Sequence, residues 1–183
     1  MKKIIIWTVA VVGILALLLF FVVGPIMRSQ TKKHSPEQTI TYTKQGNEIE
    51  VFYCRPYKKG RDVFGGLVPF DKVWRTGANE ATTFETQHDL LINGETLPKG
   101  KYTLWTKPTL SSWDIIFNSE MYGWGVSLAG VSARNPDFDV LITTVPVEQV
   151  PEVEQFTISL NETPQTMTLS WDRTKVSIPF RKK

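Results

Sequence analysis

One short run of the chain, Trp74–Thr83, combines side chains that could recognise a ligand or take part in a reaction. Four polar residues lie within six positions: Arg75, Thr76, Asn79 and Glu80. An Arg guanidinium can bind a carboxylate or a phosphate through two parallel hydrogen bonds, and a Glu can accept a proton or orient a sugar hydroxyl. Trp74 could add a flat surface on which a ring would stack.

The same run also has a purely structural interpretation, in which Arg75 pairs with Glu80 and Asn79 satisfies backbone groups of a long loop. Our first hypothesis is a binding or interaction module for a glycan, peptide or protein ligand. Its candidate ligand-binding residues are Trp74, Arg75, Thr76, Asn79, Glu80 and Trp124. Trp124 is included because it lies among glycines and is the tryptophan that we expect to be exposed. This hypothesis requires the Arg75–Glu80 loop and Trp124 to share one surface.

A hydrolase acting on a glycan or peptide is the enzymatic alternative, with Glu80 as general acid or base and Arg75 as a clamp. This chemistry needs a second carboxylate or a nucleophile within reach of Glu80. Asp62 and Asp71 are the candidates nearest in the preceding sequence. A structural or scaffold subunit is a third alternative, and it predicts a large exposed apolar patch.

The rest of the sequence is poor in catalytic groups. It contains no His-Glu-x-x-His, Gly-x-Ser-x-Gly or Cys-x-x-Cys motif and no phosphate-binding glycine loop. His34 lies in a polar segment and His88 at an expected turn, so neither is expected to bind a metal. The single Cys54 cannot form an internal disulfide and is expected to be a buried strand residue. We therefore expect no metal and no cofactor.

The segments that must position these residues alternate in the manner of short strands, with frequent turn signals and no long helical period. Hairpin turns are expected at Gln45-Gly46-Asn47, Asn93-Gly94 and Asp172-Arg173-Thr174, of which Asn93-Gly94 is the strongest signal. The expected strands are Thr39–Thr43, Glu48–Tyr53, Ala81–Gln87, Asp89–Ile92, Lys101–Thr106, Trp113–Phe117, Asp139–Val145, Gln155–Leu160, Thr166–Trp171 and Lys175–Phe180. The irregular stretch Ser127–Phe138 could form a flap. The pattern predicts one all-β domain over residues 38–183, an antiparallel sandwich or jelly roll.

The N-terminal segment is different in kind, because Ile4–Val23 contains no charged residue. A helix of that length rises about 30 Å, which matches the hydrocarbon thickness of a membrane. We expect a cytosolic stub at residues 1–3, a transmembrane helix over residues 4–24 and a juxtamembrane linker over residues 25–37. A cleaved signal peptide is the alternative, although its apolar core normally spans only about 7–15 residues.

The basic residues that flank the apolar segment give little information on its orientation in the membrane, whereas the charge balance of the β-domain restricts the kind of partner. Lys2 and Lys3 precede the apolar segment, whereas Arg28, Lys32 and Lys33 follow it. We expect a signal anchor with the C-terminal domain outside the cytoplasm, on the periplasmic side, because three residues are more plausible as a cytosolic stub than as a translocated start. Residues 38–181 hold 14 basic and 17 acidic residues, so no nucleic-acid partner is expected.

A set of motifs covers most of the expected β-domain. Its members are Lys59–Pro69, Val73–Thr83, Leu97–Leu104, Ile116–Asn118, Trp124-Gly125 and Trp171–Val176. Together they resemble the bacterial family catalogued as domain of unknown function 2911, over roughly Tyr53–Phe180. The resemblance implies an exported protein with one compact domain, of a kind found mostly in Bacteroidota, and it implies no activity. The chain departs from the usual pattern in its long anchor and at Cys54, where we would expect a small polar residue.

Overall fold

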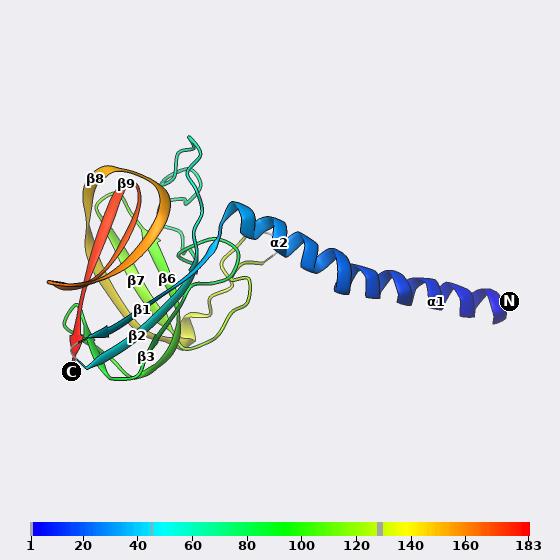
Figure 1. The fold of residues 1–183 in the computed structure, drawn as a ribbon, viewed down its shortest axis with the longest axis horizontal. Coiled ribbons are helices and arrows are strands. Elements are labelled where there is room, and N and C mark those ends of the chain that lie inside the picture. The colour runs from blue at the N-terminus through cyan, green and yellow to red at the C-terminus, as the bar shows by residue number, and fades with distance from the viewer. Residues whose placement is uncertain (1, 45, 128–129) are drawn as a thin grey trace. The chain divides into compact units, whose positions relative to one another are not determined.

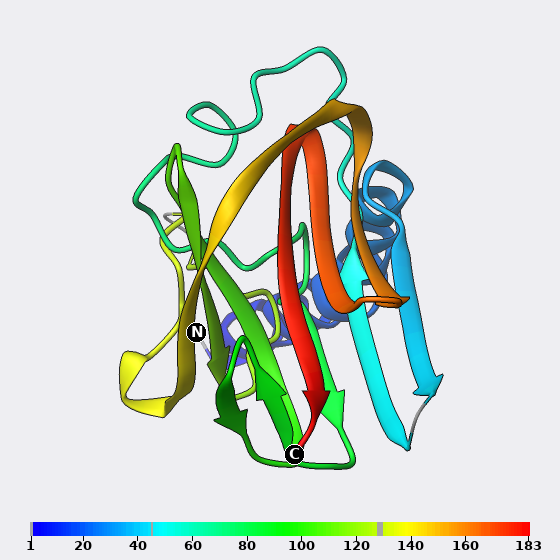
Figure 2. The same cartoon turned by 90° about the vertical axis from the view of Figure 1, so that its left-hand side faces the viewer.

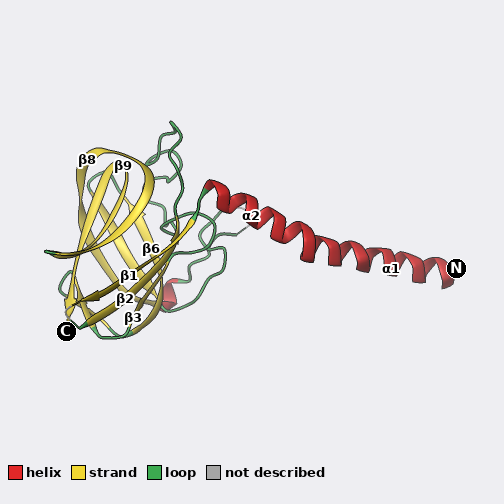
Figure 3. Cartoon of the chain, viewed as in Figure 1, coloured by secondary structure: helices red, strands yellow, loops and turns green. Residues whose placement is uncertain are grey.

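The computed structural model of the protein describes residues 2–44, 46–127 and 130–183, and the chain divides into two compact units (Figure 1). Residues 1–34 form a helical unit and residues 35–183 form a β unit, as the colours of Figure 3 show. The second unit contains all of the candidate site residues. The turn expected at Gln45-Gly46-Asn47 includes Gln45, which lies outside the described residues.

The helical unit consists of α1 (Lys2–Leu18), a π-helical turn (Leu19–Val23) and α2 (Gly24–His34). Its most apolar window has a mean hydropathy of 2.9, and the helix is long enough to cross a membrane. A signal sequence near the N-terminus can meet the same criteria of length and composition, so the finding supports membrane association in general. The π-turn precedes Pro25, which lacks the N–H that a regular α-helix would use there. The segment expected as a juxtamembrane linker, residues 25–37, is helical as far as His34, because α2 extends to that residue.

The β unit is one antiparallel sheet of nine strands in the order β1-β2-β3-β6-β7-β8-β9-β4-β5. The strands are β1 (Glu37–Lys44), β2 (Asn47–Cys54), β3 (Thr83–Thr86), β4 (Leu90–Ile92), β5 (Glu95–Leu97), β6 (Gly100–Pro108), β7 (Ser112–Asn118), β8 (Asp139–Glu162) and β9 (Gln165–Lys182). A short 3-10 helix, Pro136–Phe138, precedes β8. The expected all-β, sandwich-like domain is confirmed.

The long strand β8 belongs to both layers of the sandwich. Its first part pairs with β7 and its second part pairs with β9, and Figure 2 shows the ribbon crossing the domain and turning over at one end. The inward residues change from odd positions (Leu141, Val145) to even positions (Phe156, Ile158) across register shifts between Gln149 and Thr157. A bulged corner therefore lets one strand turn its apolar side toward the core twice.

The hairpin expected at Asp172-Arg173-Thr174 is wrong, because β9 runs without interruption through it. Buried positions along β9 also change from odd (Trp171) to even (Val176), and Asp172 has a positive φ of 53°. A bulged bend and a tight turn break the strand alternation in the same way, so the pattern alone did not separate them. The Asn93-Gly94 turn is confirmed, with φ values of 46° and 89° between β4 and β5.

Aromatic side chains connect the two layers across the core. Tyr42 packs edge-on against Phe180, and Tyr53 packs edge-on against Phe156. The Tyr53 hydroxyl also accepts a hydrogen bond from the Ile158 N–H at 3.0 Å and lies 3.2 Å from the Ile158 carbonyl oxygen, to which it can donate. Tyr53 therefore joins the end of β2 to β8 by both packing and hydrogen bonding.

A second, smaller core lies on the outer face of β6 and β7. Trp105 and Ile116 point away from the main core, yet both are almost completely buried. Val73, Ala81 and Tyr122 cover them, from the loop after β2 and the loop after β7. The candidate site is built on this cover.

We expect Tyr53→Phe to lower the melting temperature of the protein by about 3–10 °C. The substitution leaves buried backbone groups of Ile158 without a partner, which costs about 1–3 kcal/mol, and 1 kcal/mol corresponds to about 2–4 °C in a domain of this size. Tyr57→Phe is the matched control, because within the described residues the Tyr57 hydroxyl makes no hydrogen bond. Equal melting temperatures for the two variants, measured by tryptophan fluorescence, would contradict the proposed link.

Candidate functional site

The run from Trp74 to Thr82 is a tightly bonded loop. Trp74 pairs with Thr106 of β6 through two backbone hydrogen bonds, of 2.7 and 3.0 Å. The Thr82 hydroxyl donates to the Thr76 carbonyl oxygen at 2.7 Å and closes the loop on itself. Gly77 lies against the end of β2, where an added Cβ would stand 2.9 Å from the Cys54 carbonyl oxygen. A side chain at this position would separate the loop from the strand.

Three of the predicted site residues are engaged with the protein itself. The Trp74 indole N–H donates to the Gly77 carbonyl oxygen at 3.0 Å, and its ring packs against Trp113, Phe156 and Trp171. The Thr76 hydroxyl is fully buried, 3.2 Å from that of Thr106. Asn79 donates to the Ser35 carbonyl oxygen at 3.4 Å. These contacts fix the shape of the loop.

Arg75 is the predicted site residue with an unmet hydrogen-bonding group. Within the described chain, its Nε is the buried side-chain nitrogen or oxygen atom that has no hydrogen-bond partner. Burial lowers the pKa of the guanidinium from its ordinary value, and Cys54 and Glu80 partly oppose that effect. The group still carries its charge at neutral pH.

The loop after β7 lies directly on Arg75. An added Cβ at Gly125 would stand 3.2 Å from Cδ of Arg75, and Gly125 has a φ of 74°. The Ala81 N–H donates to the Gly123 carbonyl oxygen at 3.1 Å. Trp124, which is 39% exposed, therefore lies in a loop that packs directly beside the Arg75–Glu80 loop. No signal in the sequence indicated the contact between Gly125 and Arg75.

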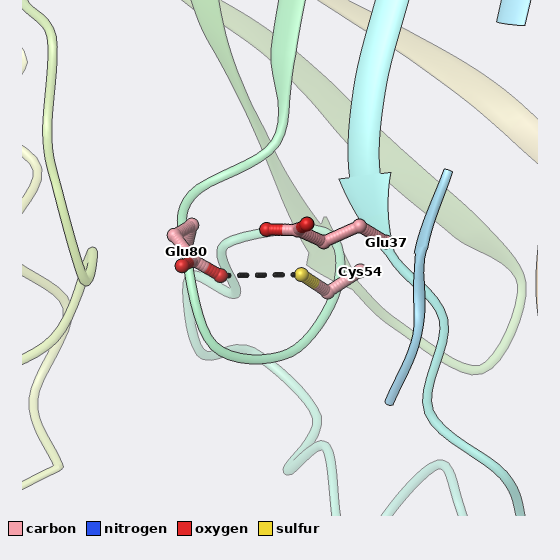
Figure 4. A group of neighbouring side chains, drawn as sticks. All are labelled: Glu37, Cys54 and Glu80. Carbon is pink, nitrogen blue, oxygen red and sulfur yellow. Dashed lines mark hydrogen bonds between the residues drawn. The ribbon is translucent and has the colours of Figure 1, made fainter. Parts of the chain in front are cut away.

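Glu80 lies in a group that sequence reasoning did not assemble. The Cys54 thiol donates to Oε2 of Glu80 at 3.2 Å, and one ligand atom each of Glu37, Cys54 and Glu80 lies within 4.8 Å of the others (Figure 4). Glu37 begins β1 and stands directly opposite Cys54, the last residue of β2. Extending the register of the expected β1–β2 hairpin outward brings this pair together, but the polar sequence predicts that residue 37 belongs to the linker.

The Cys54 thiol remains protonated at neutral pH. Its burial, reinforced by the neighbouring Glu80 carboxylate, raises the pKa of the thiol to about 12. A nucleophilic cysteine needs a lowered pKa, so this environment opposes that role.

A thiolate with two carboxylates is a ligand set that zinc accepts. Binding would first have to remove the thiol proton, and Arg75 contributes a positive charge nearby. The ligand atoms of the three residues are of a suitable type and lie close enough together to hold a metal ion. With the thiol protonated, its hydrogen bond to Glu80 already satisfies the Cys54 side chain.

The carboxylate beside Glu80 is that of Glu37. The group that surrounds Glu80 contains neither Asp62 nor Asp71, and both of these residues are exposed. The second carboxylate that the hydrolase hypothesis requires near Glu80 is therefore that of Glu37, which is distant from Glu80 in the sequence.

The segment after β7 is anchored by polar contacts at both ends. The Asn118 side chain donates to the Asn135 carbonyl oxygen and to Asp139, both at 2.8 Å. The Tyr122 hydroxyl accepts from the Asn135 N–H at 2.7 Å. Residues 128–129 of the expected flap lie outside the described residues. The described ends hold the Trp124 loop over Arg75.

We expect the free energy of unfolding to fall at alkaline pH more steeply for the parent than for Cys54→Ser. The unfolded thiol has a pKa of about 8.5. Above that pH the unfolded chain releases a proton that the folded chain retains up to about pH 12, so stability decreases as pH rises. Between about pH 8.5 and 10 the difference should be on the order of 2 kcal/mol. Parallel pH profiles in denaturant titrations would contradict the raised pKa.

Comparison with known proteins places the chain in a family. A family model described as "Protein of unknown function (DUF2911)" matches residues 35–180, which is nearly the whole β unit. No curated protein and no solved structure matches the chain. The matched range includes the complete Trp74–Thr83 loop and the Cys54–Glu80 contact. The chain therefore belongs to the DUF2911 family.

Proposed function

We propose that the β unit is a ligand-binding module whose site is formed by Arg75, Glu80 and Trp124, with Glu37 at its edge. The observation that carries the proposal is the buried Nε of Arg75 without an acceptor. A buried donor without a partner costs about 1–3 kcal/mol, and more when the group is charged, so such groups are rare in folded proteins. A ligand acceptor would remove this cost on binding.

The surrounding charges restrict the ligand. Arg75 can donate hydrogen bonds, whereas the Glu37 and Glu80 carboxylates can accept them. A fully anionic ligand would meet two negative groups, so an uncharged ligand with neighbouring donors and acceptors fits better. Adjacent sugar hydroxyls and peptide amides both have this character. The exposed Trp124 ring could add a stacking contact.

A hydrolase is the second candidate, because the Glu37 and Glu80 carboxylates approach each other. Their oxygen atoms lie within 4.8 Å, and retaining glycosidases use two carboxyl groups about 5–5.5 Å apart. The same ligand screen separates the two functions. A bound oligosaccharide or peptide that is recovered intact after prolonged incubation indicates a binding module, and a cleaved one indicates a hydrolase.

We expect Arg75→Met to leave the melting temperature unchanged or to raise it slightly. The substitution keeps most of the apolar stem and removes a buried donor that has no acceptor. Arg55→Met is the matched control, since the Arg55 guanidinium donates to the Phe156 carbonyl oxygen at 3.1 Å and to the Thr157 hydroxyl at 2.8 Å. Losing these bonds should cost about 1.5–3 kcal/mol, or about 3–10 °C.

The measurement is thermal unfolding of the full chain in detergent, without ligand and with chitotriose or trialanine as probes. A stabilising probe should lose its effect in Arg75→Met and retain it in Arg55→Met. An equal fall in melting temperature for both variants would show that Arg75 is a structural clasp, and the proposed site would then be lost.

We also propose that the apolar helix is an uncleaved signal anchor and that the β unit lies outside the cytoplasm. Basic residues lie on both sides of the apolar segment, Lys2 and Lys3 at one end and Arg28, Lys32 and Lys33 at the other, so they do not decide the orientation. The uncharged length of Ile4–Val23 supports an uncleaved anchor, because the apolar core of a cleaved signal peptide normally spans only about 7–15 residues. A C-terminal alkaline phosphatase fusion should be active and a green fluorescent protein fusion dark in a bacterial host. The membrane-bound product should keep the mass of the full chain. A bright fluorescent fusion, or a product shortened by the apolar helix, would contradict the proposal.

A further inference from the structure

A concave site separate from the Arg75 site lies at the bulged corner of the sandwich. It is a pocket of about 210 Å³ between the loop around Phe64, the turn before β7 and the strands β8 and β9 at the corner. Its lining includes none of the residues of the Arg75 site. The two sites therefore differ in position and in composition.

The floor of the pocket is aromatic. Phe64 and Trp113 line it and pack together with ring centroids 4.9 Å apart, and Phe70 adds a third ring. Trp113 is only 1% exposed. Trp113 also packs edge-on against Trp74, whose ring in turn packs against Phe156 and Trp171 in the core. The floor is thus part of a rigid core.

Trp113 differs from Trp74, Trp105 and Trp171 in its hydrogen bonding. Trp74, Trp105 and Trp171 each donate the indole N–H to a protein oxygen, at 3.0, 2.9 and 3.3 Å. Trp113 makes no such hydrogen bond within the part of the chain that the structure describes. A buried tryptophan normally satisfies this donor, and Trp113 is the tryptophan that lines the pocket. Arg75 Nε is the fully buried side-chain atom without a partner among the described residues, so the Trp113 N–H must reach solvent, and a ligand oxygen in the pocket could replace water as its acceptor.

The rim of the pocket is polar and partly fixed in place. Asp172 accepts a hydrogen bond from Lys58 at 2.6 Å, and Lys58 also pairs with Glu152 at 3.2 Å. Arg173 and Gln149 lie on the same rim and are exposed to solvent. The rim therefore offers a positioned carboxylate, a guanidinium and an amide around an aromatic floor.

Size and chemistry together restrict the ligand. An apolar cavity of about 150 Å³ holds a benzene molecule, so this pocket has room for one six-membered ring. A purely aromatic ring would leave the polar rim unused. A pyranose ring has an apolar face for the aromatic floor and hydroxyl groups for Asp172, Arg173 and the Trp113 N–H. We propose that the corner pocket is a binding site for a single pyranose unit of a glycan.

The test is a titration of the full chain in a detergent without sugar groups, such as dodecylphosphocholine. The probe is methyl β-D-glucopyranoside, and the signals of the tryptophan indole N–H groups are followed by nuclear magnetic resonance. The Trp113 indole signal should move saturably, and the Trp7 signal should not. Arg173→Ala and Gln149→Ala should each weaken binding, by about tenfold where the side chain makes one strong hydrogen bond.

Arg181→Ala is the matched control, since Arg181 is an exposed arginine of the same strand outside the pocket. It should bind the probe as the parent does. Arg75→Met should also retain binding, which separates this inference from the proposed Arg75 site. The inference is overturned if the Trp113 signal does not respond to the sugar, if it responds to phenol alone, or if the rim variants bind as tightly as the parent.

Discussion

The need to bury the outward-facing Trp105 and Ile116 determines where the site lies. A sandwich normally leaves its outer faces to water, but these two side chains make one outer face apolar. The chain covers them with the loop after β2 and the loop after β7. Because the two covers must meet over one small patch, Arg75 and Gly125 come into contact. The candidate site therefore lies where the two loops that bury the second core meet.

The same constraint explains why one loop contains both structural and unmet polar groups. Thr76 and Asn79 hold the backbone of the cover in place, and Trp74 reaches through to the main aromatic cluster. Arg75 belongs to the loop after β2 and lies where the loop after β7 packs onto it, so its stem is packed but its Nε has no hydrogen-bond acceptor. The motif that characterises the sequence therefore divides into residues that shape the loop and residues that remain available to a ligand.

Local patterns in the sequence were sufficient to predict the all-β fold, most strand positions and the Asn93-Gly94 turn. They failed at Asp172, because a bulged bend breaks strand alternation as a hairpin does. The position of Arg75 could be predicted only as a motif, since its burial depends on a loop some 50 residues away. The pairing of Glu37 with Cys54 could be reached from hairpin register only by extending the expected strands into the segment predicted to be a linker, and their approach to Glu80 depends on Gly77 packing against the strand.

The sharing of β8 by both layers has a consequence for how the chain can change in length. A single residue inserted before Gln149 would reverse the inward and outward sides of the segment that pairs with β7, and one inserted after Thr157 would do the same opposite β9. The corner between these positions already contains extra residues and shifted register. Within β8, insertions and deletions should therefore be tolerated mainly at the corner between Gln149 and Thr157, which can vary in length beside the pocket while the two layers keep their register.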